Sequence, residues 1–131
     1  GLDVVECWGT GKASREFLYV EDAAEAVVTA AEVHNDPQPI NLGSGREITI
    51  ADLATLIARL CGFNGKMVWD AQRSDGQPRR RLDTTRAEKL LSWRAKVELE
   101  QGLRRTIDWW RAAYPGPAST MPLKKYVGPT F

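Results

Sequence analysis

Basic side chains gather in one stretch of the sequence, residues 73–89. Six Lys or Arg against three Asp or Glu give this stretch a local charge of 6 − 3 = +3. The planar arginine guanidinium can bind phosphate oxygens through two parallel hydrogen bonds. Asp75, on the Ser-Asp-Gly-Gln-Pro turn of the same stretch, can accept hydrogen bonds from sugar hydroxyls. By charge alone, the stretch fits a solvated face, a phosphate site or a nucleic-acid patch.

Two glycine pairs are the other candidates for ligand binding. Gly9 and Gly11 would need a glycine at position 14 to make a GxGxxG fingerprint, and position 14 is Ser. Gly43 and Gly45 would need one at position 48, which is Ile. Neither pair therefore opens a dinucleotide-binding helix, and both are interpreted as tight turns.

Residues for proton or metal chemistry are sparse. A Tyr-x-x-x-Lys pair is absent, because the fourth residue after each of the three tyrosines is Ala23, Ala118 or Thr130. The single histidine, His34, excludes a multi-histidine metal site within this chain. Cys7 and Cys61 lie far apart with no CxxC, which predicts reduced thiols in a cytoplasmic protein.

The composition is that of a globular protein. Of 131 residues, 43% are apolar and 27% are charged, and the net charge is +1. This balance excludes a disordered chain and points to no anionic partner by itself. The apolar stretches are only a few residues long, so we expect no membrane span, and the acidic start of the sequence does not resemble a signal peptide.

Periodicity and turn residues predict a mixed α/β chain. Strands are expected at residues 3–8, 15–20, 39–42 and 66–70, with a turn of extended chain at 47–49, and helices are expected at 21–34, 50–61, 84–91 and 98–114. Thr49 and Asp52 have capping-box spacing, and Gly62 is expected to end the helix that follows. We expect one folded unit at residues 1–114 and an extended tail at 115–131. The strands are too few and short for a self-sufficient doubly wound sheet.

Several blocks, in order, resemble one family. WGTG at residues 8–11 and REFLYVEDAA at 15–24 resemble the WGTG…REFLYVDDLA block of the GDP-L-fucose synthases, which are extended short-chain dehydrogenases/reductases. INLGSG at 40–45, followed by ITI, is similar to that group's INxGxG…TI. DAQRSDGQPRRRLD at 70–83 resembles D(T/A)SKPDGTPRKLLD, and Trp93 with LEQGL at 99–103 is similar to the LGW…SLEEGL ending.

The resemblance implies a small mixed α/β substrate-binding lobe that lacks the Rossmann domain. It implies that Trp8 lines a GDP-sugar pocket and that Arg15 binds the diphosphate. It further implies that Asp75 binds the nucleotide through ribose hydroxyls, and that Arg80, where the family has Lys, binds phosphate too. No catalytic, cofactor-binding or metal-binding residue is expected in this chain, and NADP(H) would belong to the parent enzyme.

The implied parent enzyme converts GDP-4-keto-6-deoxymannose to GDP-L-fucose, with this chain contributing binding alone. Its expected partners are a GDP-sugar and an N-terminal Rossmann domain, with no nucleic acid and no membrane. An apolar surface left exposed without that domain would favour self-association. Two alternatives stay open: the lobe of a UDP- or dTDP-sugar epimerase or dehydratase, and a standalone module that binds a phosphorylated ligand or nucleic acid.

Overall fold

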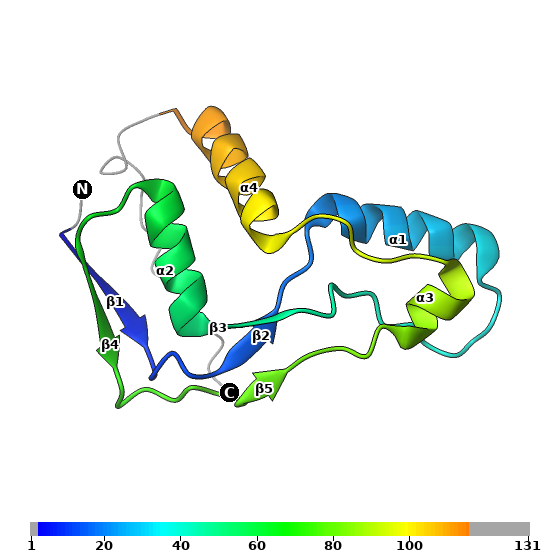
Figure 1. Ribbon diagram of the computed structural model, residues 1–131, viewed down its shortest axis with the longest axis horizontal. Helices are drawn as coiled ribbons and strands as arrows, with labels where there is room; N and C mark the ends of the chain where they lie inside the picture. Colours follow the sequence, from blue (N-terminus) through cyan, green and yellow to red (C-terminus); the bar gives the residue numbers. More distant parts are fainter. Residues whose placement is uncertain (1–2, 116–131) are drawn as a thin grey trace.

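The computed structural model describes residues 3–115, and the part of the predicted tail at 116–131 lies outside the described residues. The fold is mixed α/β, as predicted (Figure 1). In chain order, the elements are β1 (Val4–Trp8), β2 (Ser14–Glu16), α1 (Val20–Val33), β3 (Glu47–Thr49), α2 (Ile50–Cys61), β4 (Lys66–Asp70), β5 (Arg79–Arg80), α3 (Thr85–Leu91) and α4 (Leu99–Ala113).

The strands form two small sheets. β1 and β4 pair in parallel, with Val4 opposite Lys66 and Trp8 opposite Asp70. In the second sheet, β2 lies between β3, which runs antiparallel to it, and β5, which runs parallel. β2 follows β1 after a short turn, and β5 follows β4 after a loop. The ends of the first sheet therefore lead directly into the second (Figure 1).

The predicted ends of α2 are confirmed. The Thr49 hydroxyl accepts a hydrogen bond from the Asp52 N–H at 3.1 Å, which satisfies a free donor of the first turn. It also donates to the Asp52 carboxylate at 2.6 Å. Gly62 follows the last turn at φ 71°, a left-handed conformation that favours glycine. α2 contacts β3 and α4, and it lies between α4 and the strands β1 and β4 (Figure 1).

The small buried core lies between α1 and α3. Ala26 and Ala87 are fully buried, and Leu91 and Trp93 pack with them. Two alanines facing each other allow the helices to approach closely. Asp22, at the start of α1, is also buried, and its carboxylate accepts hydrogen bonds from the Lys96 and Val97 N–H groups at 3.0 and 2.9 Å.

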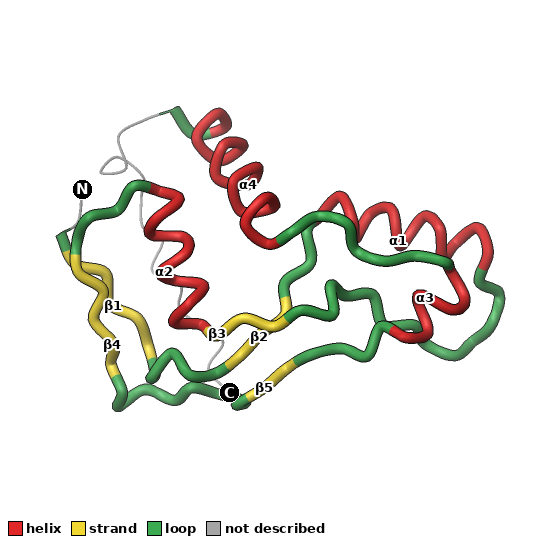
Figure 2. Tube along the Cα trace, viewed as in Figure 1, coloured by secondary structure: helices red, strands yellow, loops and turns green. Residues whose placement is uncertain are grey.

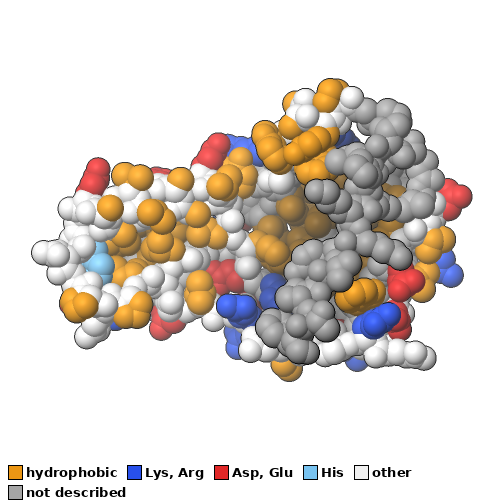
Figure 3. All heavy atoms as spheres, turned by 180° about the vertical axis from the view of Figure 1, so that it is seen from behind, with side chains coloured by type: hydrophobic (Ala, Val, Ile, Leu, Met, Phe, Trp, Pro, Cys, Tyr) orange, Lys and Arg blue, Asp and Glu red, His pale blue; other side chains and the backbone are white. Residues whose placement is uncertain are grey.

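The apolar residues whose spacing predicted α1 lie mostly on its outer side. Val27 and Val28 are 59% and 57% exposed, and Val20 is 69% exposed. Figure 3 shows hydrophobic side chains gathered along the part of the molecule formed by α1 and α3. The helix thus buries Ala26 and exposes Val27 and Val28.

Three expectations for the strands were wrong in detail. β2 ends at Glu16 instead of continuing to Val20, because its neighbours β3 and β5 are three and two residues long and offer no further partners. Residues 39–42 form no strand, since no strand of the described chain pairs with them (Figure 2). Arg79 and Arg80, expected in a loop, add a short strand to β2.

Candidate functional site

Arg15 and Arg80 come together although they lie far apart in the sequence. Arg15 is in β2 and pairs with Arg80 across the parallel β2–β5 ladder. Both line a cavity of about 210 Å³ with Glu16, Leu18, Leu42, Gly43 and Leu82. The structure therefore places Arg15 and Arg80 side by side at one small cavity.

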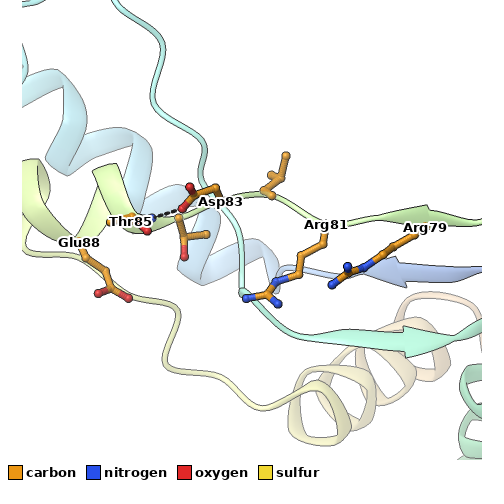
Figure 4. A pocket seen from close by; sticks show the side chains of 7 residues that line it. Arg79, Arg81, Asp83, Thr85 and Glu88 are labelled. Carbon is orange, nitrogen blue, oxygen red and sulfur yellow. Dashed lines mark hydrogen bonds between the residues drawn. The ribbon is translucent and has the colours of Figure 1, made fainter.

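The flanking arginines of β5 line a different cavity. Successive side chains of a strand point to opposite faces. Arg79 and Arg81 line a polar cavity of about 530 Å³ with Leu82, Asp83, Thr84, Thr85 and Glu88. Figure 4 shows Arg79 and Arg81 on the same side of the chain, with the acidic Asp83 and Glu88 at the other end of the cavity. That cavity contains both signs of charge.

Glu47 on β3 neutralises Arg79. The Arg79 Nη2 and Nε groups donate to the Glu47 carboxylate at 2.6 and 2.9 Å. This hydrogen-bonded pairing, with a further hydrogen bond from Ser14, lowers the pKa of Glu47 from 4.5 to about 2. Within residues 3–115, no carboxylate forms an ion pair with Arg15 or Arg80. The Arg15 Nη1 group donates instead to the Ser14 carbonyl at 2.6 Å.

Glu16 also lines the cavity of Arg15 and Arg80, and backbone N–H groups donate hydrogen bonds to both oxygens of its carboxylate. One oxygen accepts the Gly45 N–H at 2.9 Å, and the other accepts the Leu82 N–H at 2.8 Å. These bonds tie the end of β2 to the loop before β3 and to the chain after β5. Glu16 thereby holds the cavity walls together, a role that the motif alone did not predict.

Asp75 lies in the loop between β4 and β5, beside the Gly9–Gly11 turn. Its carboxylate oxygens accept hydrogen bonds from the Thr10 N–H at 2.6 Å and from the Thr10 hydroxyl at 2.5 Å. The Thr10 hydroxyl is the largest cause that lowers the pKa of Asp75 below 3.8. The direct contact of Asp75 with ribose hydroxyls stays a prediction, and Thr10 is a contact that sequence reasoning missed.

Trp8 ends β1 and is 68% exposed. The Arg73 guanidinium lies 5.0 Å from the centre of the Trp8 ring, a cation–π contact, and its Nε lies 3.3 Å from an Asp70 carboxylate oxygen. Arg73 was noted only as part of the basic stretch. A large exposed aromatic ring held by a cation is a surface on which a planar or sugar group can stack.

The four predicted residues, or the glycines next to them, lie near one another in the order Trp8, Asp75, Arg15 and Arg80. Gly9 follows Trp8 and touches Asp75, since a Cβ built on Gly9 would overlap the Asp75 carboxylate. Gly76, next to Asp75, is close to Arg15, because a Cβ built on Gly76 would lie 3.7 Å from the Arg15 Nη2 atom. The structure thus brings Trp8, Asp75 and Arg15 to neighbouring places, with Arg80 beside Arg15.

Comparison with known proteins shows which proteins this chain is similar to. Residues 2–43 match the model of the NAD dependent epimerase/dehydratase family. The chain is 42% identical over 110 residues to GDP-L-fucose synthase 1 of Arabidopsis thaliana, covering 84% of this chain and 34% of that protein. It is 41% identical over 117 residues to the GDP-L-fucose synthase of Escherichia coli, covering 82% of this chain and 36% of that one.

A solved structure gives a similar result. UDP-glucose 4-epimerase from Thermotoga maritima, with UDP-glucose, superposes with a TM-score of 0.77 at 32% identity. The superposition covers 83% of this chain and 35% of that one. The chain spans about a third of the length of the curated relatives it matches, 34% for the Arabidopsis enzyme and 36% for the Escherichia coli enzyme. Over residues 3–115, no helix is both long and apolar enough to cross a membrane.

Proposed function

We propose that this chain, which belongs to the NAD-dependent epimerase/dehydratase family, is the nucleotide-sugar-binding part of a GDP-L-fucose synthase-like enzyme. The observation that carries the proposal is the pairing of Arg15 with Arg80 beside one cavity, with no carboxylate of the described chain bound to either. Two such cations match the charge of a nucleoside diphosphate. The overall charge of +1 could not have indicated this.

In this proposal, Arg15, Arg80 and Trp8 each contact a different part of the ligand or share its diphosphate. Arg15 and Arg80 bind the diphosphate through charged hydrogen bonds, each worth roughly 1.5–3 kcal/mol. The exposed ring of Trp8 stacks on the base or the sugar, at the other end of this row of residues. Binding and orientation of a substrate are a real catalytic contribution, because they remove the entropic cost of bringing the reacting groups together.

The chemistry of the whole enzyme is part of the proposal. It would epimerise GDP-4-keto-6-deoxymannose at two carbons and then reduce the ketone with NADPH. The printed sequence has no Tyr-x-x-x-Lys and no GxGxxG. We therefore assign proton and hydride transfer, and the binding of NADP(H), to the part of the enzyme outside these residues. This chain should not consume NADPH with a 4-keto-6-deoxy nucleotide-sugar, and turnover by the purified chain would contradict the assignment.

The exposed valines of α1 support an interface with the rest of that enzyme. Val27 and Val28 are exposed side by side on α1. Exposed apolar patches of this kind are typical of surfaces that contact another domain or protein. Without a covering domain, the same surface should favour self-association of the chain. Size-exclusion chromatography checks this, since a strictly monomeric chain at high concentration would count against it. The free Cys7 and Cys61 are compatible with the predicted cytoplasmic location, which stays a prediction.

One second candidate has a specific observation in its favour. The superposed epimerase structure holds UDP-glucose, so the lobe of a UDP-sugar or dTDP-sugar enzyme is the runner-up. Two charged groups that bind a diphosphate do not discriminate between bases. The identity of the base must therefore be tested directly.

The test compares GDP, UDP, dTDP and a short single-stranded RNA as ligands of the chain by isothermal titration calorimetry. We expect GDP to bind most tightly and R15A/R80A to weaken its binding. R104A is the matched control, because Arg104 pairs with Glu100 on the exposed side of α4. Tighter binding of UDP or dTDP would select the runner-up. Binding of RNA in preference to every nucleotide would select the standalone binding module.

A further inference from the structure

We infer that Glu16 is a positioning residue that acts through Arg80. Its carboxylate ties the chain after β5 to β2 and so holds the Arg80 guanidinium next to Arg15, where both can bind a diphosphate. The inference rests on the proposed function for its ligand. By its charge alone, a carboxylate at the cavity of two arginines would repel a diphosphate, because like charges repel. A positioning role and a role through charge therefore predict different behaviour for Glu16 variants.

The first support is the short pairing that places Arg80. β5 has only two residues, and its last pair in the parallel ladder is Arg15 with Arg80. Beyond this ladder, the Leu82 N–H donates to the Glu16 carboxylate at 2.8 Å. A side chain thus continues the connection to β2 after the backbone pairing ends. The position of Arg80 therefore depends on a two-residue strand and on this hydrogen bond.

The second support is the use of the other carboxylate oxygen. It accepts the Gly45 N–H, in the loop before β3, at 2.9 Å. The two donors lie 29 and 66 positions away from Glu16 in the sequence. A charged acceptor makes both bonds stronger than bonds between neutral groups. One side chain thereby fixes the spacing of three segments that line the cavity: the end of β2, the loop before β3 and the chain after β5.

The third support is the close approach of the loop at Gly43. A Cβ built on Gly43 would overlap the Glu16 carboxylate. Gly43 is buried and Glu16 is half-buried, so the carboxylate has little room to move. Gly43 is not among the glycines at positive φ, so its backbone conformation is compatible with alanine. The glycine is needed here because it lets the loop approach the carboxylate closely enough for the Gly45 bond to form.

Glu47 provides a contrast within the same sheet. It lies opposite Glu16 in the register of β2 and β3. Its carboxylate accepts hydrogen bonds from side chains, those of Arg79 and Ser14, whereas Glu16 accepts them from backbone groups. Arg79 lines the other cavity. Shortening Glu47 therefore disturbs the same sheet without releasing the segment that places Arg80.

The test measures GDP binding to E16D, R80A and E16D/R80A variants of the chain by calorimetric titration. Aspartate keeps the negative charge but is one methylene shorter, so it cannot hold both N–H groups. We expect E16D to weaken GDP binding by about threefold to tenfold, and by no more than R80A does. In the R80A background, E16D should cause no further loss, because its effect is transmitted through Arg80. A merely structural role would cause the same loss in both backgrounds.

E47D is the matched control, and it should change GDP binding by less than about twofold. E16D that binds GDP like the wild type would overturn the inference, because a role through charge alone predicts this result. Equal losses from E16D with and without Arg80 would overturn it too. If E16D does not fold, G43A replaces it in the same comparison, since the added methyl group displaces the Glu16 carboxylate and leaves every charge in place.

Hydrogen exchange distinguishes failure of this inference from failure of the proposed function. Without any ligand, the Leu82 and Gly45 amides should be protected in the wild type and should exchange faster in E16D. The Lys96 amide, which donates to the buried Asp22 carboxylate, is the internal reference and should not change. A rapidly exchanging wild-type Leu82 amide would overturn the inference whether or not GDP binds. A protected Leu82 amide in a chain that does not bind GDP would instead overturn the proposed function, and with it the ligand-positioning role.

Discussion

Arg79 and Arg80 are neighbours in β5, yet their surroundings differ completely. Arg79 projects toward β3, where it binds Glu47 through Nε and Nη2, and it lines a cavity that also contains acidic side chains (Figure 4). Arg80 lies beside Arg15 at a cavity where, among residues 3–115, Glu16 is the one carboxylate in the lining, and it is bound to two backbone N–H groups. One arginine joins two strands, and the other is left available to an anion.

The difference shows that charge available for binding cannot be counted from composition. The alternation of β5 places Arg79 in an ion pair with Glu47 and Arg80 at the proposed ligand site. An exposed ion pair contributes little to stability, at most about 1 kcal/mol, whereas an unpaired cation in a cavity can bind phosphate strongly. The predictions below test this division between the two faces.

The largest effect is expected for Arg15. R15A should weaken binding of a GDP-sugar by about tenfold to a hundredfold, because a charged hydrogen bond to the diphosphate is lost. R79A should change it by less than about twofold, since Glu47 already neutralises Arg79 and exposed pairs matter little. Calorimetric titration of both variants measures the contrast. Equal losses would show that the two faces are not functionally different.

A smaller effect is expected for R80K. Lysine keeps the charge that the resembling family has at this position and removes only the planar fork. We expect a loss of about threefold, against about tenfold for R80A, because charge supplies most of the attraction and bidentate geometry supplies the remainder. Affinities of the two variants at one salt concentration give the comparison. If R80K binds as weakly as R80A, the guanidinium geometry matters more than its charge.

E47Q should have the smallest effect on binding of a GDP-sugar. It should instead change how the stability of the fold depends on pH. The pairing with Arg79 lowers the Glu47 pKa from 4.5 to about 2, so the unfolded chain binds this proton more readily than the folded chain. The stability from this group is therefore fully present above pH 4.5 and is lost as the pH falls toward 2. The difference in melting temperature between wild type and E47Q should shrink over that interval.

The control for this last measurement is E32Q. Glu32 is exposed on α1 and forms no ion pair within residues 3–115, so its substitution should leave the pH dependence of stability unchanged. A melting-temperature difference for E47Q that is the same at every pH would show that the Glu47–Arg79 pair does not stabilise the fold.

Much of the local structure could be predicted from the sequence, because its causes are local. The Thr49 cap and the Gly62 end define α2 through hydrogen bonds and backbone angles within a few residues. The motif blocks also indicated the resemblance to GDP-L-fucose synthases, to which the chain is 42% and 41% identical in Arabidopsis thaliana and Escherichia coli. That Arg15 and Arg80 bind phosphate stays a prediction. A long amphipathic repeat similarly indicated α4, whose observed bounds are close to those predicted.

Only the tertiary structure decided which partners the polar side chains have. Residues 39–42 were expected to form a strand, but a strand needs a neighbour, and the described chain provides none there. That Asp75 binds the nucleotide stays a prediction, and only the tertiary structure shows that its carboxylate also accepts two hydrogen bonds from Thr10. Glu47 and Arg79 meet across 32 positions, so no local pattern could reveal which arginine is neutralised. Hydrogen bonds and ion pairs depend on atoms being within about 3–4 Å, and the path of the chain through space alone determines those distances.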